Sequence, residues 1–418
     1  MSKIFLSLFS ILQHSTTSGG LRIYVLMSLS LQLQLRPQVL LDRFFAINRE
    51  ADKRIRSELG PIADTQNIRQ QIIFGSQKSC SPWEAKDPPC YAVPKSTLPD
   101  DIYGSNTDTD AARESSRDTP NVNFRPRFLN AGMGIGTVPA MRKLFKQAEK
   151  QANGKADAGS DQHIFSQIFG DQELWREAVR RDAKGPRNSA KKEWSHEHID
   201  AVRQKASRQS DGTFEFGIGI DYHSQIGLNT VSAGDDNEWL RFEDSSQIHA
   251  VEADRGIYPP HQRLNNISAD IKNSLPPFWT FTVEPDLDRW KQWDEVPLLT
   301  NVYTGVAPAI IHHDTQSEDL KSLRESWWDK IWFSEKARIL LDTYIYAPIA
   351  PIAHSGYNER DMREWWPYEI WKGGARNGLA ALGSFGEGEW LRFDDMCRDS
   401  HAEVFRDGKG PWNLPQAH

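Results

Sequence analysis

Hydrophobic and polar residues alternate along residues 28–35, which read SLSLQLQL. Leucine at every second position predicts a half-buried strand with its leucines on one face. After Pro37 the period changes, and Val39, Leu40 and Phe44 predict a helix over residues 37–59, with Pro37 in its first turn. Functional groups of α/β proteins often lie where a strand gives way to a helix. This junction carries no acid, no histidine and no glycine.

The rest of the chain repeats this order of strands and helices. Apolar runs predict strands over residues 70–76, 213–221 and 307–314. Residues 127–150 predict a strand, a glycine-rich turn and a helix, and further helices are expected from Ser160 onward and over about 317–346. Residues 81–126 are expected to form a long loop, 183–212 a surface insertion, and 348–418 a loop-rich end. Strands that alternate with helices predict an α/β fold with a mixed sheet.

Composition is that of a soluble globular protein, with 38% hydrophobic and 26% charged residues among 418. A net charge of −7 gives no indication of a nucleic-acid partner. Eight of the 15 tryptophans follow residue 320, so the C-terminal part is compositionally distinct. Tryptophan can stack on sugar rings, but we expect most of these side chains to fill a core.

Three short features bear on the cell compartment. Cys80 and Cys90 flank a proline-rich loop, and they form either a local disulfide or two free thiols. The sequon at Asn266 is compatible with a secretory route. The apolar stretch at residues 4–12 is shorter than the roughly 20 residues of a membrane span, and no clear cleavage site follows it.

One octapeptide nearly repeats, as EWLRFEDS at residues 238–245 and EWLRFDDM at 389–396. No wider similarity surrounds the two copies, so we expect two similar edge strands and no duplicated domain.

The glycines at positions 132, 134 and 136 are a candidate for ligand binding. Their spacing fits neither a Walker loop nor a dinucleotide fingerprint. Two interpretations remain open: a tight strand–helix connection, or a backbone-lined pocket in which Asn130 hydrogen-bonds a polar ligand.

Acids and histidines follow several of the apolar runs. Those at strand or helix ends are Asp161, Asp221, His312, His313 and Asp314. Singly each is typical of a cap or a surface residue, but a histidine with one or two carboxylates would suit Mn²⁺ or Mg²⁺. The HEHID segment at 196–200 is a weaker metal candidate, because helical zinc ligands prefer a spacing of three or four residues.

Five motifs in order resemble the glycosyltransferase domain of the procollagen lysyl hydroxylases, and still more closely fungal glycosyltransferase-like proteins. They are IIFGSQKSCSPW, FLNAGMGIGTVPAMRKLF, SDQHIFSQIF, IGIDYHSQIG and AIIHHD. The resemblance covers roughly residues 36–330 and implies a GT-A-like mixed sheet flanked by helices. The Trp-rich C-terminal extension lies outside it.

The resemblance implies a role for each matching residue. His312 corresponds to a metal ligand, usually for Mn²⁺, which bridges the diphosphate of a nucleotide sugar such as a UDP-sugar. Asn130, Ala131 and Gly132 correspond to the segment that contacts the donor sugar, and we place Asp221 near the same pocket. Asp161 and Gln162 correspond to catalytic positions beside the reacting sugar. Ser160 is a departure, since a further acid is common there.

The resemblance also shows what the opening junction lacks. In the family, the strand before QLRPEVLL ends in an acidic motif that holds the metal, whereas this chain has MSLSL before QLRPQVLL. We therefore expect an N-terminally incomplete domain that binds metal and nucleotide sugar poorly, from a degenerate protein or, as we favour, a mis-assigned start. The expected division is an atypical N-terminus at 1–33, a GT-A-like domain at 34–335 and the extension at 336–418.

The function expected on this basis is transfer of a hexose from a nucleotide sugar to a hydroxyl of a glycan or protein acceptor, impaired by the missing acids. The expected location is the fungal secretory pathway, in the Golgi or ER lumen or at its membrane. The alternative is a non-catalytic carbohydrate-binding or scaffold protein. A third hypothesis, a metal-dependent hydrolase, uses HEHID and IIHHD.

Overall fold

The structure of the protein is a computed structural model. It describes residues 8–14, 22–27, 31–109, 122–153, 159–185, 196–230, 233–279, 288–313, 326–346, 350–355, 362–366, 379–382, 389–392, 394 and 400–412. The chain divides into two compact units. Unit 1 is built from residues 42–236 and 310–312, and unit 2 from residues 6–41, 237–309 and 313–418. The boundaries expected at residues 33 and 335 stay a prediction.

Unit 1 contains a mixed sheet, so the α/β class is confirmed. Its central strand, β4 (Ile72–Gln77), pairs antiparallel with β5 (Phe128–Thr137) and parallel with β6 (Ile218–Ile220). A separate parallel pair joins β7 (Gly227–Asn229) to β10 (Ile310–His312). The strand predicted over 70–76 is therefore present, shifted by one or two residues.

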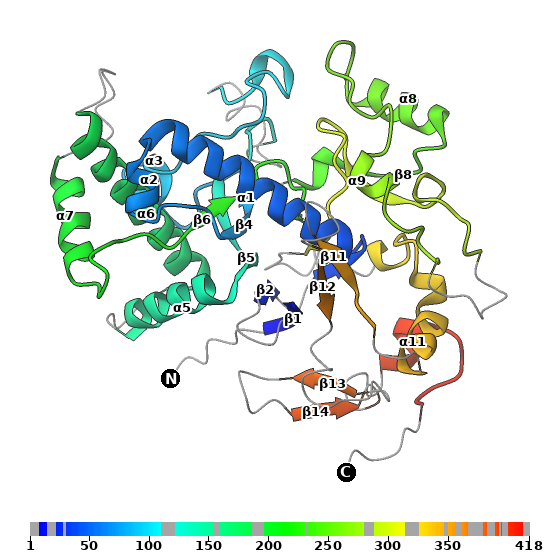
Figure 1. Ribbon diagram of the computed structural model, residues 1–418. Coiled ribbons are helices and arrows are strands. Elements are labelled where there is room, and N and C mark those ends of the chain that lie inside the picture. Colours follow the sequence, from blue (N-terminus) through cyan, green and yellow to red (C-terminus); the bar gives the residue numbers. More distant parts are fainter. Residues whose placement is uncertain are drawn as a thin grey trace. The chain divides into compact units, whose positions relative to one another are not determined.

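Several helices cover this sheet. Helix α1 (Pro37–Leu59) belongs to unit 1 from residue 42 onward. The other helices of this unit are α2 (Ile62–Thr65), α3 (Pro88–Tyr91), α5 (Val138–Asn153), α6 (Asp161–Lys184) and α7 (His196–Ser207). Two short 3₁₀ helices, η1 (Gly104–Asn106) and η2 (Gly234–Asp236), also belong to it. In Figure 1, α6 lies among α3, α5 and α7, and it also packs on β5. Of the two residues at which the sequence allows this helix to be capped, Ser160 and Asp161, the structure uses Ser160, whose hydroxyl accepts a hydrogen bond from the His163 N–H.

Gln172 of α6 binds the backbone of residues 216–218. Gln172 is fully buried, and its Oε1 accepts from the backbone N–H groups of Phe216 and Ile218 at 3.1 and 2.9 Å. Its Nε2 donates to the Ile218 carbonyl at 2.9 Å. These bonds satisfy buried backbone groups that no neighbouring strand reaches. The strand predicted over 213–221 is shorter than expected, because only residues 218–220 form β6.

Two further predictions for unit 1 are wrong. The glycine-rich segment is no turn: residues 128–137 form one continuous strand, and none of its three glycines has a positive φ angle. Residues 183–212 are no simple surface insertion either, since α7 buries Ile199, Val202 and Ala206 and packs against α6. Their helical spacing on one face explains this burial.

Unit 2 holds short antiparallel strands and small helices. Strand β1 (Leu8–His14) pairs with β2 (Arg22–Met27) and β12 (Arg363–Trp366), and β12 pairs with β11 (Ala353–Ser355). Two-stranded pairs join β8 (Asn237–Leu240) to β9 (Leu298–Asn301) and β13 (Leu379–Leu382) to β14 (Glu389–Arg392). Further elements are β3 (Leu31–Leu33), α8 (Ser245–Asp254), α9 (Ala269–Lys272), η3 (Trp293–Glu295), η4 (Ser334–Lys336), α11 (Ala337–Tyr346) and α13 (His401–Phe405).

The repeated octapeptide forms a strand in both copies, as predicted, in β8 and β14. Buried tryptophans in this unit include Trp239, Trp293, Trp327 and Trp365. Of the tryptophans after residue 320 whose side chains the structure describes, Trp327 and Trp365 are buried and the others are half-buried, so the expected core role is met by these two. A hydrophobic cluster in this unit gathers around Leu240 and consists of aliphatic side chains with Phe242 and Tyr303 packed against them.

Two predictions for unit 2 need correction. The burial pattern of the opening strand is reversed at its end: Leu33 is 47% exposed, whereas Gln34 is 1% exposed, and its amide bonds the backbone of Leu299 and Pro308. The long helix over 317–346 is interrupted within its described part, because turns and η4 precede α11. The Ser334 hydroxyl donates to the Asp329 carbonyl, which competes with regular helical bonding there.

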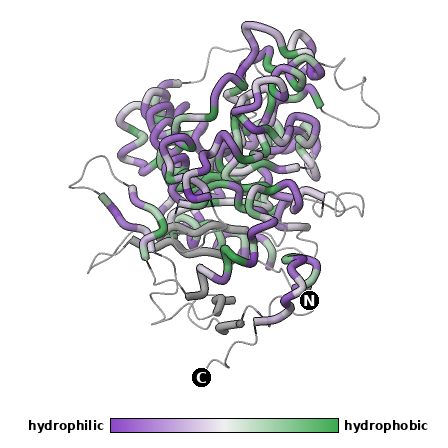
Figure 2. Tube along the Cα trace, turned by 90° about the vertical axis from the view of Figure 1, so that its right-hand side faces the viewer, coloured by the Kyte–Doolittle hydropathy of each residue, from purple (hydrophilic) through white to green (hydrophobic). Residues whose placement is uncertain are grey.

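Hydropathy varies over short distances throughout the described chain. Figure 2 shows green, hydrophobic positions in short runs between purple, hydrophilic ones, in keeping with a mean hydropathy of −0.62. Among the helices that the structure describes, none combines the length and apolar character that crossing a membrane requires.

Candidate functional site

The first part of the site joins β5 to the start of α6. Asn130 is 2% exposed; its Oδ1 accepts from the Gly132 N–H at 3.1 Å and its Nδ2 donates to Gln77 Oε1 at 3.1 Å. Gln162 Oε1 accepts from the Ala131 N–H at 2.7 Å, and its Nε2 donates to the Leu129 carbonyl at 2.6 Å. These bonds fix the backbone of residues 129–132 in one conformation, with Gln162 as a positioning residue.

The second part places His312 against Gly132. A Cβ atom added to Gly132 would lie 1.9 Å from His312 Cε1 and 2.4 Å from Nε2, so the imidazole rests directly on the glycine backbone. His312 is 3% exposed, pairs with Asn229 in register, and its carbonyl accepts from the Thr230 N–H at 3.0 Å. Only glycine permits this approach. Residues from the FLNAGMGIG, SDQ and IIHHD motifs are thus brought together within unit 1.

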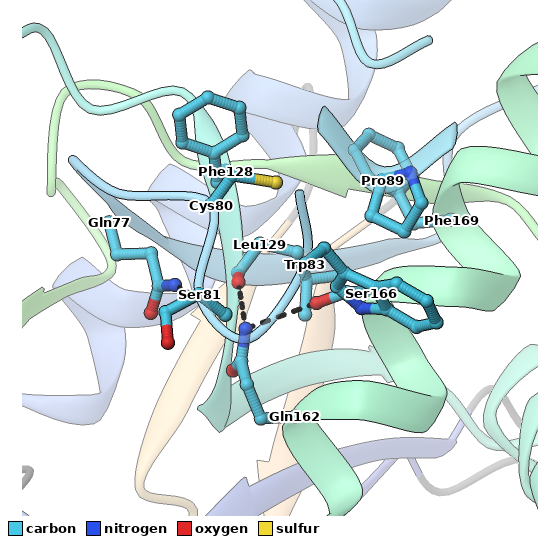
Figure 3. Close-up of a pocket in the computed structure, with 10 residues that line it drawn as sticks. All are labelled: Gln77, Cys80, Ser81, Trp83, Pro89, Phe128, Leu129, Gln162, Ser166 and Phe169. Atoms are coloured by element: carbon cyan, nitrogen blue, oxygen red, sulfur yellow. Dashed lines mark hydrogen bonds between the residues drawn. The ribbon is translucent and has the colours of Figure 1, made fainter. Parts of the chain in front are cut away.

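A narrow crevice adjoins this cluster (Figure 3). Gln77, Leu129, Gln162 and Ser166 line it together with the disulfide-bonded loop 80–90, and Figure 3 shows the Gln162 amide between the Leu129 carbonyl and the Ser166 hydroxyl. The space between the lining atoms is about 200 Å³, and none of it admits a water molecule. In this conformation the crevice is closed to a sugar ring.

Trp83 of the loop stacks on His163, the residue after Gln162, with ring centroids 3.8 Å apart. The backbone of Pro88 and Pro89 lies so close to Gly170 of α6 that a Cβ there would come within 2.6 Å of the Pro89 nitrogen. The loop is therefore fixed on the first half of α6, over the residues that hold β5.

A disulfide closes this loop. Cys80 and Cys90 are bonded, so of the two alternatives that the sequence left open the structure has the disulfide and not two free thiols.

We expect Cys80→Ala/Cys90→Ala to lower the free energy of unfolding by about 2–3 kcal/mol, because the open loop gains conformational entropy in the unfolded chain. Urea unfolding of the oxidised wild type and the double variant measures this difference. Cys397→Ala is the control, and an equal loss there would contradict the assignment.

The two predicted aspartates lie in different environments. Asp161 is exposed at the first turn of α6, where its Oδ1 accepts from the Gln162 N–H at 2.8 Å. Asp221 is 2% exposed, and its Oδ2 accepts from the backbone N–H groups of Ile226 and Gly227 at 2.6 and 3.3 Å. Burial raises the pKa of Asp221, while those backbone donors oppose the rise. Asp221 thus stabilises the turn between β6 and β7. Its predicted role in binding the donor sugar gains no support from these contacts.

The surroundings of His312 do not suit Mn²⁺. Mn²⁺ prefers carboxylate and other oxygen ligands, whereas His312 packs on the backbone of Gly132 and pairs with Asn229. In the part of the chain that the structure describes, no three His, Cys, Asp or Glu side chains gather closely enough to hold a metal ion. We therefore assign no step to this ion.

The HEHID segment is helical, as predicted. The Nδ1 atom of His198 lies 2.6 Å from the hydroxyl oxygen of Tyr91, and the two form a hydrogen bond. His196 is exposed. The same search of the described residues leaves the hydrolase hypothesis without a metal site.

Sequence reasoning missed several residues of the site. Gln77 contacts Asn130 from the end of β4, and Ser166 lies one helical turn after Gln162. The spacing of four between Gln162 and Ser166 indicates a shared helix face. Nothing in the local sequence signals that Trp83 stacks on His163, because their contact depends on the path of the disulfide loop.

Comparison of the sequence with models of known protein families and with curated proteins finds no match.

Proposed function

We propose that this protein is a glycosyltransferase-like protein with a GT-A-like domain, and that it binds a nucleotide sugar where β5 meets His312. One observation carries the proposal: Asn130–Gly132, Gln162 and His312, which belong to three separate motifs, lie together in unit 1. These bonds hold the amide and imidazole groups in one arrangement, and the adjoining crevice has to open before a sugar hydroxyl can reach them.

The proposed reaction transfers a hexose to a hydroxyl group. The bond between the anomeric carbon and the diphosphate oxygen breaks, a bond to the acceptor oxygen forms, and the acceptor proton passes to a base. Asp161 is the candidate base, since it is an exposed carboxylate next to Gln162. Without the acidic motif, little in the described site offsets the charge on the leaving diphosphate, so transfer is expected to be slow.

The second candidate is a non-catalytic carbohydrate-binding protein on the same fold. The groups around His312 favour the binding protein. One imidazole packed against a glycine backbone can hydrogen-bond a sugar, but it suits no hard metal ion.

A secretory location is part of the proposal. The Cys80–Cys90 disulfide supports it, since such bonds persist in oxidising compartments. Asn266, the acceptor of the sequon, is exposed.

Thermal unfolding of the full chain with UDP-glucose and UDP-galactose tests this proposal. A ligand at 100 times its dissociation constant adds about 2.7 kcal/mol to the free energy of unfolding. We expect a stabilising shift that is lost in His312→Ala and Asn130→Ala and kept in His249→Ala, whose side chain is exposed on α8. Circular dichroism of each variant without ligand checks that it folds.

Release of UDP in the presence of glycan acceptors separates the two candidates. UDP release that His312→Ala abolishes supports the enzyme, whereas a shift with glycan alone and no UDP release supports the binding protein. Absence of a shift with every nucleotide sugar and glycan would refute both.

A further inference from the structure

The chain contains one N-glycosylation sequon, Asn266-Ile267-Ser268. A sequon consists of asparagine, any residue except proline, and serine or threonine, and isoleucine in the middle position meets this condition. Motifs of this length also arise by chance. The surroundings of Asn266 in the structure therefore decide whether the folded protein has room for a glycan there.

Asn266 lies in an irregular segment of unit 2, between α8 and α9. Residues 261–268 form neither helix nor strand, and Asn266 is exposed at a bend of this segment. N-linked glycans are bulky and occupy surface positions. The asparagine thus has the exposed loop position that the modification needs.

Buried neighbours on both sides of Asn266 fix the path of this segment. Leu264 is fully buried in a hydrophobic cluster, Ile267 is 9% exposed, and Ile271 of α9 is fully buried. The side chains of Asn265 and Asn266 remain exposed. A glycan on Asn266 would therefore displace no core residue.

Ser268, the third residue of the sequon, marks the end of the irregular segment. Its backbone is extended, with φ −60° and ψ 146°. Its carbonyl accepts from the N–H groups of Ile271 and Lys272 at 3.1 and 3.0 Å. Helix α9 consequently begins directly after the sequon and leaves Asn266 outside its hydrogen bonds.

A second observation, from the other unit, points to the compartment in which sequons are used. The Cys80–Cys90 disulfide belongs to unit 1 and lies far along the sequence from Asn266. Disulfides persist in oxidising compartments, and sequons are glycosylated in secreted proteins. Two unrelated features of the chain therefore fit the same compartment.

We propose that Asn266 carries an N-linked glycan. The oligosaccharide comes from a lipid diphosphate donor: the bond between its anomeric carbon and the diphosphate oxygen breaks, and a bond to Nδ2 of Asn266 forms. Nδ2 loses one proton to a base of the modifying enzyme, and the lipid diphosphate leaves. This inference rests on the secretory location in the proposed function, but not on the nucleotide-sugar site, because Asn266 belongs to unit 2.

Expression of the full chain in a fungal host, with and without an added secretion signal, tests the proposal. Peptide N-glycosidase F removes the glycan and converts its asparagine to aspartate, which mass spectrometry locates in the tryptic peptide 264–272. We expect this conversion and a matching gel shift in the wild type, both with and without the signal. Asn266→Gln and Ser268→Ala should abolish them, whereas Ser268→Thr should keep them.

Two controls separate the possible failures. Asn265→Gln should leave the glycan in place, since Asn265 is the exposed neighbour outside the sequon. Leu275→Thr turns the exposed Asn273 into a second sequon asparagine, and the replaced leucine is itself 51% exposed.

The outcomes distinguish the sequon from the location. A glycan at Asn273 in Leu275→Thr with Asn266 unmodified would overturn the proposal for this sequon. Glycans at both positions only with the added signal would refute the secretory location and, with it, the modification of the native chain. Failure of nucleotide-sugar binding at His312 would leave a glycan at Asn266 unchanged, so the two proposals can fail separately.

Discussion

Gly132→Ala is expected to be one of the most damaging single substitutions in unit 1. The new Cβ would lie 1.9 Å from His312 Cε1, 2.4 Å from Nε2 and 2.8 Å from Nδ1, so the whole imidazole would have to move. His312 is buried on a paired strand and has little room to do so. Overpacking of this kind costs about 1–3 kcal/mol, and we expect the upper end. Urea unfolding followed by circular dichroism measures the loss.

Gly75→Ala is the matched control. It lies on the neighbouring strand β4, and its nearest contact would be Met133 Cε at 3.4 Å, an ordinary distance. We expect a change within about 0.5 kcal/mol. In a His312→Ala background the ring is gone, so Gly132→Ala should lose most of its cost and the double-mutant cycle should show at least 1 kcal/mol of coupling. Additive effects would mean that the two residues do not meet as described.

The helices of unit 1 could be predicted from the sequence because their signals are local. Ser160 caps α6 and Pro37 opens α1, as their positions predict. Leu144 and Met141 mark the buried face of α5. Each signal depends on residues within one or two turns, so no knowledge of the rest of the fold is needed.

The glycine-rich strand could not be predicted in this way. Glycine suggests a turn because it allows positive φ angles, yet these glycines are needed for space. A Cβ on Gly134 would lie 3.0 Å from the Phe74 ring, and one on Gly136 would lie 2.9 Å from Ile72. The cause is packing against another strand, which the local pattern does not contain.

The same limit applies to the candidate site. His312 and Gly132 are separated by 180 residues, and packing of β10 against β5, which belong to different sheets, brings them into contact. The resemblance placed both residues at one site, whereas spacing alone left Gly132 as a turn and His312 as a strand end.

Arg176→Met is expected to have the largest effect on stability. The guanidinium of Arg176 on α6 forms two bonds to Glu215, at 2.7 and 2.8 Å, and one to Glu173 at 2.9 Å. All three side chains are at most 13% exposed. Removing the arginine leaves two buried carboxylates without their cation, which should cost about 3–5 kcal/mol near pH 7. Urea unfolding of the wild type and the variant measures this loss.

The loss in Arg176→Met should depend on pH in a defined direction. Burial already raises the pKa of Glu173 in the wild type, and removal of Arg176 raises it further because the opposing attraction is lost. Between the unfolded and folded pKa values the folded variant binds more protons than the unfolded chain, so its free energy of unfolding rises as the pH falls through the folded pKa toward that of the unfolded carboxyl. Urea unfolding at several pH values follows this recovery.

Two further variants decide whether the buried charges are the cause. Adding Glu173→Gln and Glu215→Gln to Arg176→Met removes both charges while keeping the amide oxygens as acceptors, and should restore most of the stability and abolish its extra pH dependence. Arg203→Met is the surface control, because its partners Asp182 and Asp200 are more than 60% exposed and such pairs contribute at most about 1 kcal/mol. If the triple variant stayed as unstable as Arg176→Met, lost packing of the arginine stem would explain the effect and charge burial would not.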